Sequence, residues 1–317
     1  MSSFFRIGDL GPVNSLVTQA LDEKIKTLTG RQEQFAGKRL GLVFMNPSLR
    51  TRMSTEIAGK NLGLDVYALE PGAGSWGLEF KPGAVMNGDK TEHIKEAAMT
   101  IGSYVDLIGV RCFPGLRDQD QDELDIVINA FRDYSGVPVM NLESSVSHPL
   151  QTLADLMTIK EHQQDEKPVV VLSWAPHVKP LPASVANSFA EGVLASGYSL
   201  RIVQPPGCEL SETFTKGADI FYDQSQAFQG ADFVYAKSWC AQKPYGLLKS
   251  PGTSWMIDAK KMKETRSAKF MHCLPVRRNV VVSDEVLDAK NSLINSQVNN
   301  RVFAAQTVIR SLLEGVR

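Results

Sequence analysis

The chain has 317 residues, of which 43% are hydrophobic and 22% charged, and its formal net charge is -1. A chain of this length exceeds what one hydrophobic core usually organises, so we expect two domains. Near neutrality gives no electrostatic reason to expect nucleic acid or an anionic membrane as a partner. No apolar run approaches the roughly 20 residues that cross a bilayer.

Two features bear on the cellular compartment. The first nine residues lack a basic segment followed by a long apolar core, which is the pattern of a secretory signal peptide. The four cysteines stand apart without C-x-x-C spacing, which predicts neither a disulfide framework nor a zinc site. We therefore expect a cytoplasmic protein.

Strand and helix patterns alternate through the first half of the chain. The expected strands are 39–45, 65–69, 105–110 and 137–140, and the expected helices are 12–28, 53–61, 91–102 and 119–134. Asp89 or Thr91 would cap the third of these helices. Repetition of strand and helix predicts a parallel sheet with helices on both faces.

A helix at 150–161 follows and would connect this domain to a second α/β series. The second series has expected strands at 167–174, 199–204, 233–236 and 269–272, and expected helices at 184–196, 224–229, 258–265 and 297–316. The fold class is therefore α/β, with two α/β/α domains that each contain a central parallel sheet. We expect residues 1–149 to form the first domain, residues 150–296 the second, and the C-terminal helix 297–317 to pack back on the first.

The segment from Asn46 to Arg52 links a buried strand to a helix and is rich in groups that bind anions. Free backbone N–H groups at a helix N-terminus, the hydroxyls of Ser48 and Thr51, and the guanidinium of Arg50 all suit a phosphate. We therefore expect a phosphate-bearing ligand at this loop.

Other polar residues also follow the ends of expected strands, which is where parallel sheets bind ligands. They are Arg111, Glu143 and His148 in the first half, and His177, Lys237, Cys273 and Arg277 in the second. Taken singly, each has an ordinary structural explanation, such as a surface ion pair for an arginine or a core position for a cysteine. Their matching positions in two successive domains favour a shared cleft between the domains.

The glycines Gly72, Gly74 and Gly77 formally match the dinucleotide-binding pattern G-x-G-x-x-G. Such a fingerprint must open a helix, whereas here Pro82 breaks the chain soon afterwards and Trp76 would crowd a pyrophosphate. A mobile loop carrying one aromatic side chain fits this segment better. No nucleophile elbow, P-loop or metal-ligand spacing is present, so we expect positional and electrostatic chemistry with no metal or cofactor.

Three motifs resemble those of the transcarbamoylase family. Ser48-Leu-Arg-Thr-Arg52 resembles the carbamoyl-phosphate loop, His148-Pro-Leu-Gln-Thr-Leu-Ala-Asp155 resembles a second family motif, and His272-Cys-Leu-Pro275 resembles the ornithine-type branch. The D-x-x-x-S-M-G motif that grips free ornithine is absent. Tyr235-Ala-Lys-Ser-Trp239 and Trp174-Ala-Pro-His-Val-Lys-Pro-Leu-Pro182 instead resemble the N-acylornithine transcarbamoylases, which act in arginine biosynthesis.

The resemblance implies a set of residue roles. Cys273, His148 and Arg111 would be catalytic. The carbamoyl-phosphate site would comprise Ser48, Leu49, Arg50, Thr51, Trp76, Arg111, His148, Gln151, Cys273, Leu274 and Arg301, and the acylornithine site Glu143, His177, Lys237, Arg277 and Thr91. The resemblance also implies a homotrimer with active sites at subunit interfaces, where Trp76 reaches into a neighbouring subunit. The substrates would be carbamoyl phosphate and an N-acylornithine.

The N-acylornithine transcarbamoylases comprise two branches, which differ in the acyl group of the acceptor. The acetyl branch typically has Glu at the position of Thr91 and a carboxylated Lys at that of Val281, whereas the succinyl branch typically has Pro and an apolar residue. Val281 matches succinyl and Thr91 matches neither. A Glu about 4 Å from the succinyl carboxylate would repel it by up to about 4 kcal/mol at an effective dielectric near 20, so losing it favours the larger acyl chain. We therefore expect N-succinylornithine as acceptor, with N-acetylornithine as the alternative and a non-catalytic carbamoyl-phosphate-binding protein as a third hypothesis.

Overall fold

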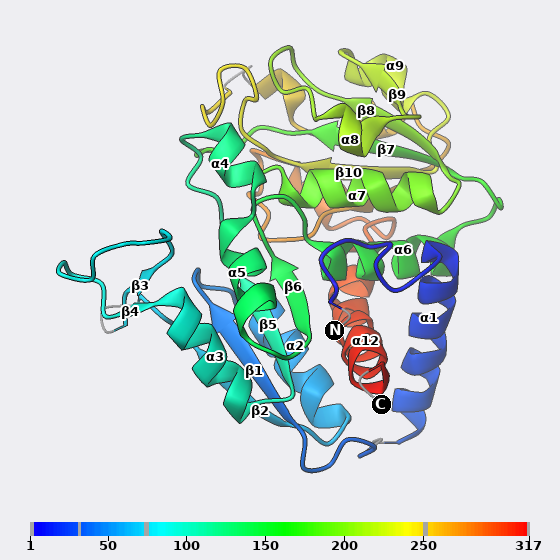
Figure 1. Ribbon diagram of the computed structural model, residues 1–317. Helices are drawn as coiled ribbons and strands as arrows, with labels where there is room; N and C mark the ends of the chain where they lie inside the picture. The colour runs from blue at the N-terminus through cyan, green and yellow to red at the C-terminus, as the bar shows by residue number, and fades with distance from the viewer. Residues whose placement is uncertain (1–2, 31–32, 73–75, 250–252, 316–317) are drawn as a thin grey trace.

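The computed structural model describes residues 3–30, 33–72, 76–249 and 253–315. Two parallel sheets, each covered by helices, form two domains stacked against one another (Figure 1). The helix α6 (Pro149–His162) runs between them and is buried along most of its length. This arrangement confirms the two α/β/α domains expected from the sequence.

The first sheet has the strand order β2-β1-β5-β6, and all its strands are parallel. Its strands are β1 (Arg39–Phe44), β2 (Asp65–Leu69), β5 (Leu107–Arg111) and β6 (Val139–Glu143). Its helices are α1 (Val13–Thr29), α2 (Arg50–Asn61), α3 (Ile94–Tyr104), α4 (Gln119–Glu123) and α5 (Ile126–Tyr134). Strands β1, β5 and β6 are buried along nearly their whole length, as expected for parallel strands that are covered on both faces.

The second sheet has five parallel strands in the order β11-β10-β7-β8-β9. Its strands are β7 (Val169–Trp174), β8 (Ser199–Val203), β9 (Asp219–Phe221), β10 (Phe233–Lys237) and β11 (Lys269–Met271). Its helices are α7 (Ser184–Ala195), α8 (Glu212–Thr215), α9 (Gln224–Phe228), the 3-10 turn η1 (Thr253–Trp255), α10 (Ala259–Met262) and α11 (Asp284–Leu287). Strand β9 was not expected from the sequence, because three residues of mixed polarity are too few to show the alternation of apolar and polar residues that is typical of a strand.

The C-terminal helix α12 (Ile294–Glu314) packs against α6, α2 and α1, so it returns to the first domain as expected. Its buried face carries Asn300, Arg301 and Gln306 among apolar residues. The amide of Gln306 bonds Glu23 of α1 at 2.5 Å. Arg301 donates to the Thr51 hydroxyl at the start of α2 and to the Gln151 side chain of α6. The last helix thereby joins the start of α2 to the helix between the domains.

Two of the helices expected in the first domain differ from the prediction. The expected helix 119–134 breaks at Asp125, whose φ of 47° lies in the left-handed region. The break lets the Asp125 carboxylate accept bonds from the Ser144 hydroxyl at 2.6 Å and the Ser145 amide at 2.9 Å, just after β6. The lost helical hydrogen bonds are thus replaced by bonds that fix the turn between β6 and α6.

The expected helix 91–102 begins later, at Ile94, and neither Asp89 nor Thr91 caps it. The cap is the imidazole of His93, whose Nδ1 accepts the amide of Lys95 at 3.2 Å. Residues just before it pair in a short parallel bridge between β3 (Leu78–Glu79) and β4 (Glu92–His93). These strands form an arm that projects from the first domain (Figure 1). The chain enters β3 directly after Gly77, so no helix follows the G-x-G-x-x-G match, whose Gly74 lies outside the described residues.

None of the helices within the described ranges is long and apolar enough to cross a bilayer. Within those same ranges, no group of His, Cys, Asp and Glu side chains has the arrangement of a metal site.

Candidate active site

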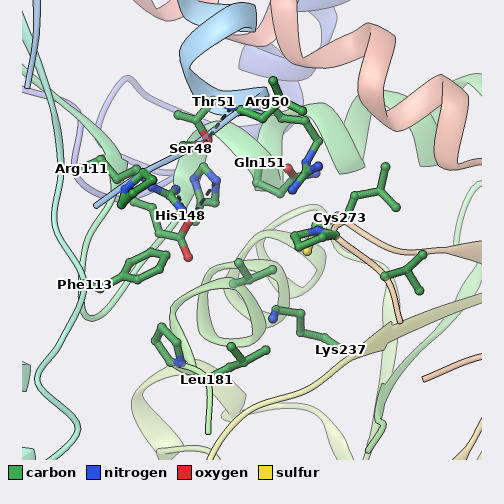
Figure 2. Close-up of a pocket in the computed structure, with 18 of the residues that line it drawn as sticks. Ser48, Arg50, Thr51, Arg111, Phe113, His148, Gln151, Leu181, Lys237 and Cys273 are labelled. Carbon is green, nitrogen blue, oxygen red and sulfur yellow. Dashed lines mark hydrogen bonds and ion pairs between the residues drawn. The ribbon is translucent and has the colours of Figure 1, made fainter. Parts of the chain in front are cut away.

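A cavity of about 540 Å³ lies between the two domains, at the carboxyl ends of both sheets (Figure 2). The first domain contributes residues that follow β1, β5 and β6, and the second contributes residues that follow β7, β10 and β11. Parallel strands all point their carboxyl ends to the same edge, which is why side chains distant in sequence meet here.

The loop from Pro47 to Thr51 forms one wall of the cavity and leads into α2. The hydroxyl of Ser48 accepts the amide of Thr51 at 3.3 Å, which closes the loop at the helix N-terminus. Arg301 donates to the Thr51 hydroxyl at 2.7 Å and also to the Gln151 side chain. Burial lowers the pKa of Arg301 to about 10 and also lowers that of Arg50. A cation whose charge is disfavoured by burial gains from a bound anion, and the free N–H groups here suit a phosphate.

Arg111 and Glu143 form a buried ion pair beside this loop. Glu143 also accepts the Ser184 hydroxyl at 3.1 Å, and the Nε2 atom of His148 lies 3.7 Å from its second oxygen. Burial lowers the pKa of His148 to about 3, so its imidazole is neutral near pH 7 and offers a neutral donor. The guanidinium of Arg111 lies over the ring of Phe113, 4.4 Å from its centre, in a cation–π contact.

The second domain supplies the opposite wall. Lys237 ends β10, and its Nζ atom donates to the Ser238 carbonyl at 3.1 Å. Cys273 follows β11, and burial raises the pKa of its thiol. Leu274 has a φ of 58°, which a branched residue adopts only when held there, and its amide donates to His272 Nδ1 at 2.8 Å. The imidazole of His272 thereby fixes the backbone on which the Cys273 thiol is presented to the cavity.

The cavity walls carry a large excess of positive charge. The cationic side chains are those of Arg50, Arg111, Lys179, Lys237, Arg277 and Arg301. Among the described lining residues, Glu143 is the only carboxylate. Such a site suits ligands with several negative charges, because each ligand anion compensates a partly desolvated cation.

Most residues expected from the sequence line this one cavity. They are Ser48, Leu49, Arg50, Thr51, Arg111, Glu143, His148, Gln151, His177, Lys237, Cys273, Leu274, Arg277 and Arg301. Trp76 and Thr91 do not line it, because they lie on the β3–β4 arm, where Trp76 is half exposed and donates from Nε1 to Glu92 at 2.8 Å. Val281 is buried in the core of the second domain beside Ile257.

Several residues that line the cavity were not expected from the sequence. Phe113, Lys179, Leu181, Pro182 and Val185 also face the cavity. Phe113 could have been found from its position two residues after Arg111 at a strand end. Lys179, Leu181 and Pro182 lie in a motif that was recognised, but only its histidine was assigned a role. Val185 lies in the first turn of α7, and nothing in the surrounding sequence indicates that it would line a binding site.

Comparison with known proteins places the chain in a family. Residues 5–161 match the model of the aspartate/ornithine carbamoyltransferase carbamoyl-P binding domain, and residues 182–312 match that of the Asp/Orn binding domain. The chain belongs to the aspartate/ornithine carbamoyltransferase family. It is a carbamoyltransferase, which confirms the class of enzyme indicated by its motifs.

Individual relatives narrow the comparison to the N-acylornithine branch. The chain is 42% identical to N-succinylornithine carbamoyltransferase of Bacteroides thetaiotaomicron over 318 residues, covering 100% of both chains. It is 37% identical to N-acetylornithine carbamoyltransferase of Xylella fastidiosa, covering 95% of this chain and 94% of that one. A crystal structure of acetylornithine transcarbamylase complexed with acetylcitrulline has a TM-score of 0.92 at 35% identity, covering 98% of this chain and 99% of that one.

Proposed function

We propose that the enzyme transfers the carbamoyl group of carbamoyl phosphate to the δ-amine of N2-succinyl-L-ornithine. The products are N2-succinyl-L-citrulline and phosphate, and the reaction belongs to arginine biosynthesis. The observation that carries this proposal is the cationic cavity, in which six positive side chains face one carboxylate. Carbamoyl phosphate brings a phosphate and succinylornithine brings two carboxylates, so both substrates match this charge.

The first domain binds carbamoyl phosphate. Its phosphate lies against the loop Ser48-Leu-Arg-Thr51 and Arg301, where N–H groups and guanidinium forks face the cavity. Arg111, His148 and Gln151 donate to the carbamoyl oxygen, which becomes an oxyanion when the amine attacks. Neutral and cationic donors in a dry site stabilise that developing charge without reorganisation.

The acceptor lies against the second domain. Glu143, His177, Lys237 and Arg277 hold the acylornithine, and Lys237 and Arg277 suit its α-carboxylate. The δ-amine approaches Cys273 and Leu274. Its unperturbed pKa is about 10 by analogy with lysine, so it must lose a proton before it can attack the carbamoyl carbon.

The choice of succinyl over acetyl rests on charge near the acyl chain. Neither Thr91 nor Val281 provides a negative group. The two Bacteroides relatives that are 42% identical to this chain are named N-succinylornithine carbamoyltransferases. Crystal structures of acetylornithine transcarbamylase variants, each with one glutamate replaced, hold carbamyl phosphate and N-succinyl-L-norvaline. Variants of a related enzyme that lack one glutamate therefore hold a ligand with a succinyl group beside carbamyl phosphate.

We further propose a cytoplasmic homotrimer in which the β3–β4 arm of one subunit completes the cavity of the next. Trp76 is separated from the start of β3 by one residue and Thr91 directly precedes β4, and neither is among the residues that line the cavity. Beside the cavity, α2 exposes an apolar face made by Leu49, Met53 and Ile57, which a neighbouring subunit would cover. Trp76 then meets carbamoyl phosphate, and Thr91 meets the acyl chain.

A three-substrate assay tests the acceptor. Carbamoyl phosphate is offered with succinyl-, acetyl- or free ornithine at equal concentration, and the ureido product is measured. Succinylornithine should give the highest kcat/KM. A preference for acetylornithine would replace the proposal with the acetyl alternative, and free ornithine as best substrate would overturn the acylornithine assignment.

A complementation assay tests the shared site. Trp76→Ala and Arg50→Ala variants should each be nearly inactive. Mixing them, unfolding and refolding together should restore activity, because some sites then combine an intact Arg50 with a neighbour's intact Trp76. Mixtures that stay inactive, while native mass spectrometry shows trimers that contain both variants, would contradict the shared site.

A further inference from the structure

A buried polar pair lies behind Cys273, on the side away from the cavity. Tyr235 of β10 pairs in register with Met271 of β11, so Cys273, two residues beyond, projects to the same side of the sheet. The Tyr235 ring stacks on Phe189 of α7, with ring centres 4.1 Å apart. The Asp155 carboxylate of α6 and the Cys273 thiol both lie close enough to interact with its hydroxyl.

Tyr235 and Asp155 are both fully buried, and neither lines the cavity. One carboxylate oxygen of Asp155 is held by the side-chain amides of Gln151 at 2.7 Å and Gln297 at 2.8 Å. Within the described residues, no atom makes a well-aligned hydrogen bond with its second oxygen or with the Tyr235 hydroxyl. The buried Tyr235 hydroxyl thus interacts with Asp155 and Cys273 without reaching good hydrogen-bond geometry with either. Such an arrangement is costly and calls for a role.

Burial and the surrounding charges together determine which of the three groups, Asp155, Tyr235 or Cys273, can exchange a proton near pH 7. Burial raises the pKa of Asp155 to about 7, against the opposing effect of the two amides and of Arg301. Burial also raises the pKa of Tyr235 and of Cys273, although Lys237 opposes the rise at the thiol while Asp155 and Glu143 add to it. Tyr235 and Cys273 therefore keep their protons at pH 7, and Asp155 is the member of the chain able to gain one.

We propose that Cys273, Tyr235 and Asp155 form a proton relay that removes the proton of the acceptor δ-amine during carbamoyl transfer. This inference rests on the proposed reaction at an ornithine δ-amine. As the amine nitrogen bonds to the carbamoyl carbon, the carbon–oxygen bond to phosphate breaks and its electron pair leaves with the phosphate. One N–H proton passes to the Cys273 sulfur, the thiol proton to the Tyr235 oxygen, and the tyrosine proton to the Asp155 carboxylate. The proton then returns along the same path to Cys273 and passes to the phosphate, whose oxygen lacks a proton after the carbon–oxygen bond breaks, so the relay is reset before the products leave.

In this scheme Cys273 touches the substrate, and Tyr235 and Asp155 act through it. The alternative is that the leaving phosphate accepts the proton directly, which would make the buried pair purely structural. The two schemes differ in their pH profiles. Deprotonation of the amine makes the rate rise with pH in both schemes. A relay ending at Asp155 also requires the carboxylate form, so it adds a second rise that levels off above a pH of about 7.

Single-turnover rates of the full-length enzyme with succinylornithine, measured by rapid quench between pH 5.5 and 8.5, test the relay. Tyr235→Phe removes one hydroxyl and keeps the ring on Phe189. It should slow the chemical step about 10²–10⁴-fold and abolish the rise near pH 7, while carbamoyl phosphate affinity changes less than about twofold. Asp155→Asn should abolish the same rise. The control Tyr198→Phe loses a hydroxyl that donates to Gln163 at 2.7 Å, far from the site, and should keep the wild-type rate and profile.

A Tyr235→Phe enzyme that retains both the rate and the pH profile would overturn the relay. If that variant does not fold, the wild-type enzyme still decides the question through its rate in mixtures of H₂O and D₂O. Several protons moving together give a curved dependence on deuterium fraction, whereas a single transfer to phosphate gives a straight line and would reject the relay. Failure of the proposed function is recognised separately, because then the wild-type enzyme carbamoylates no ornithine derivative.

Discussion

Arg111 and Glu143 are partners in the register of adjacent strands β5 and β6, and their side chains form a buried ion pair at the strand ends. Their side chains are only 9% and 10% exposed. The sheet itself therefore sets the geometry of the pair. Among the residues that the structure describes, none accepts the Nε–H of Arg111. Because Arg111 also lines the cavity, the residue retains donor capacity after the ion pair is made.

The pair predicts a large stability effect when one charge is removed. Glu143→Gln leaves the buried Arg111 without its counter-ion and should lower the free energy of unfolding by about 3–5 kcal/mol. Urea denaturation at pH 7.5 measures this. The matched control is Lys38→Met, which breaks a pair with Asp106 at side-chain exposures of 51% and 31% and should cost less than about 1 kcal/mol. Equal losses in both variants would contradict the assignment of the buried pair.

Arg301 predicts a specific loss of donor affinity. Its guanidinium joins α12 to Thr51 and Gln151, and a lysine cannot make both bonds from one nitrogen at the same angles. Arg301→Lys should weaken carbamoyl phosphate binding about 10–100-fold, as expected from losing charged hydrogen bonds worth about 1.5–3 kcal/mol. Isothermal titration calorimetry measures the affinity. Arg310→Lys, on the same helix but outside the cavity, should keep it, and a similar loss in both variants would indicate an effect on α12 as a whole.

His148 predicts a pH dependence of stability. Burial lowers its folded-state pKa to about 3, whereas the unfolded value is about 6.5. The unfolded chain therefore binds a proton that the folded protein refuses between these values. The stability from the neutral imidazole is fully present above pH 6.5 and falls by up to about 1.4 kcal/mol per pH unit below it. His148→Gln, which cannot titrate, should show a shallower fall between pH 6.5 and 5 in urea denaturation, and an unchanged slope would refute the assignment.

Gly102 predicts a steric limit within the first domain. A Cβ atom at this position of α3 would lie 1.8 Å from the carbonyl oxygen of Ser135, at the end of α5. The two helices must separate to admit it, so Gly102→Ala should destabilise the protein by about 3 kcal/mol or more. Gly88→Ala is the control, because a Cβ there would meet no atom of the described part of the chain within 4 Å. Thermal unfolding of both variants checks the prediction, and an equal midpoint would show that α3 and α5 pack less closely.

The residues at strand ends could be predicted because one geometric rule covers them. Arg111, Glu143 and Lys237 end buried apolar strands, and parallel strands carry their ends to a common edge. Neither the strand order nor the exact register was needed for that inference. The family resemblance then added Gln151, through its motif, and Arg301, through the role that the family implies. Both lie inside helices and carry no local signal of their own.

The rest depended on contacts distant in sequence. The break at Asp125 follows from bonds to Ser144 and Ser145, which local helix propensity does not register. The late start of α3 follows from pairing of Thr91 with Gly77, whose carbonyl accepts the Thr91 amide at 2.8 Å. The role of Trp76 concerns a second copy of the chain, so it stays a prediction that one subunit does not test.

The position of Thr91 leads to a prediction about the preference of the enzyme for succinylornithine over acetylornithine. Thr91→Glu adds a carboxylate to the β4 side of the arm, where the proposed trimer brings it to the acyl chain of the neighbouring site. Repulsion should reduce kcat/KM for succinylornithine about 10–1000-fold, which corresponds to up to about 4 kcal/mol at an effective dielectric near 20. Acetylornithine, which lacks the second carboxylate, should lose little or improve. Thr91→Gln has similar size without the charge and should spare succinylornithine. If both variants lower succinyl activity equally, bulk rather than charge governs this position, and if neither does, the arm lies away from the acyl chain.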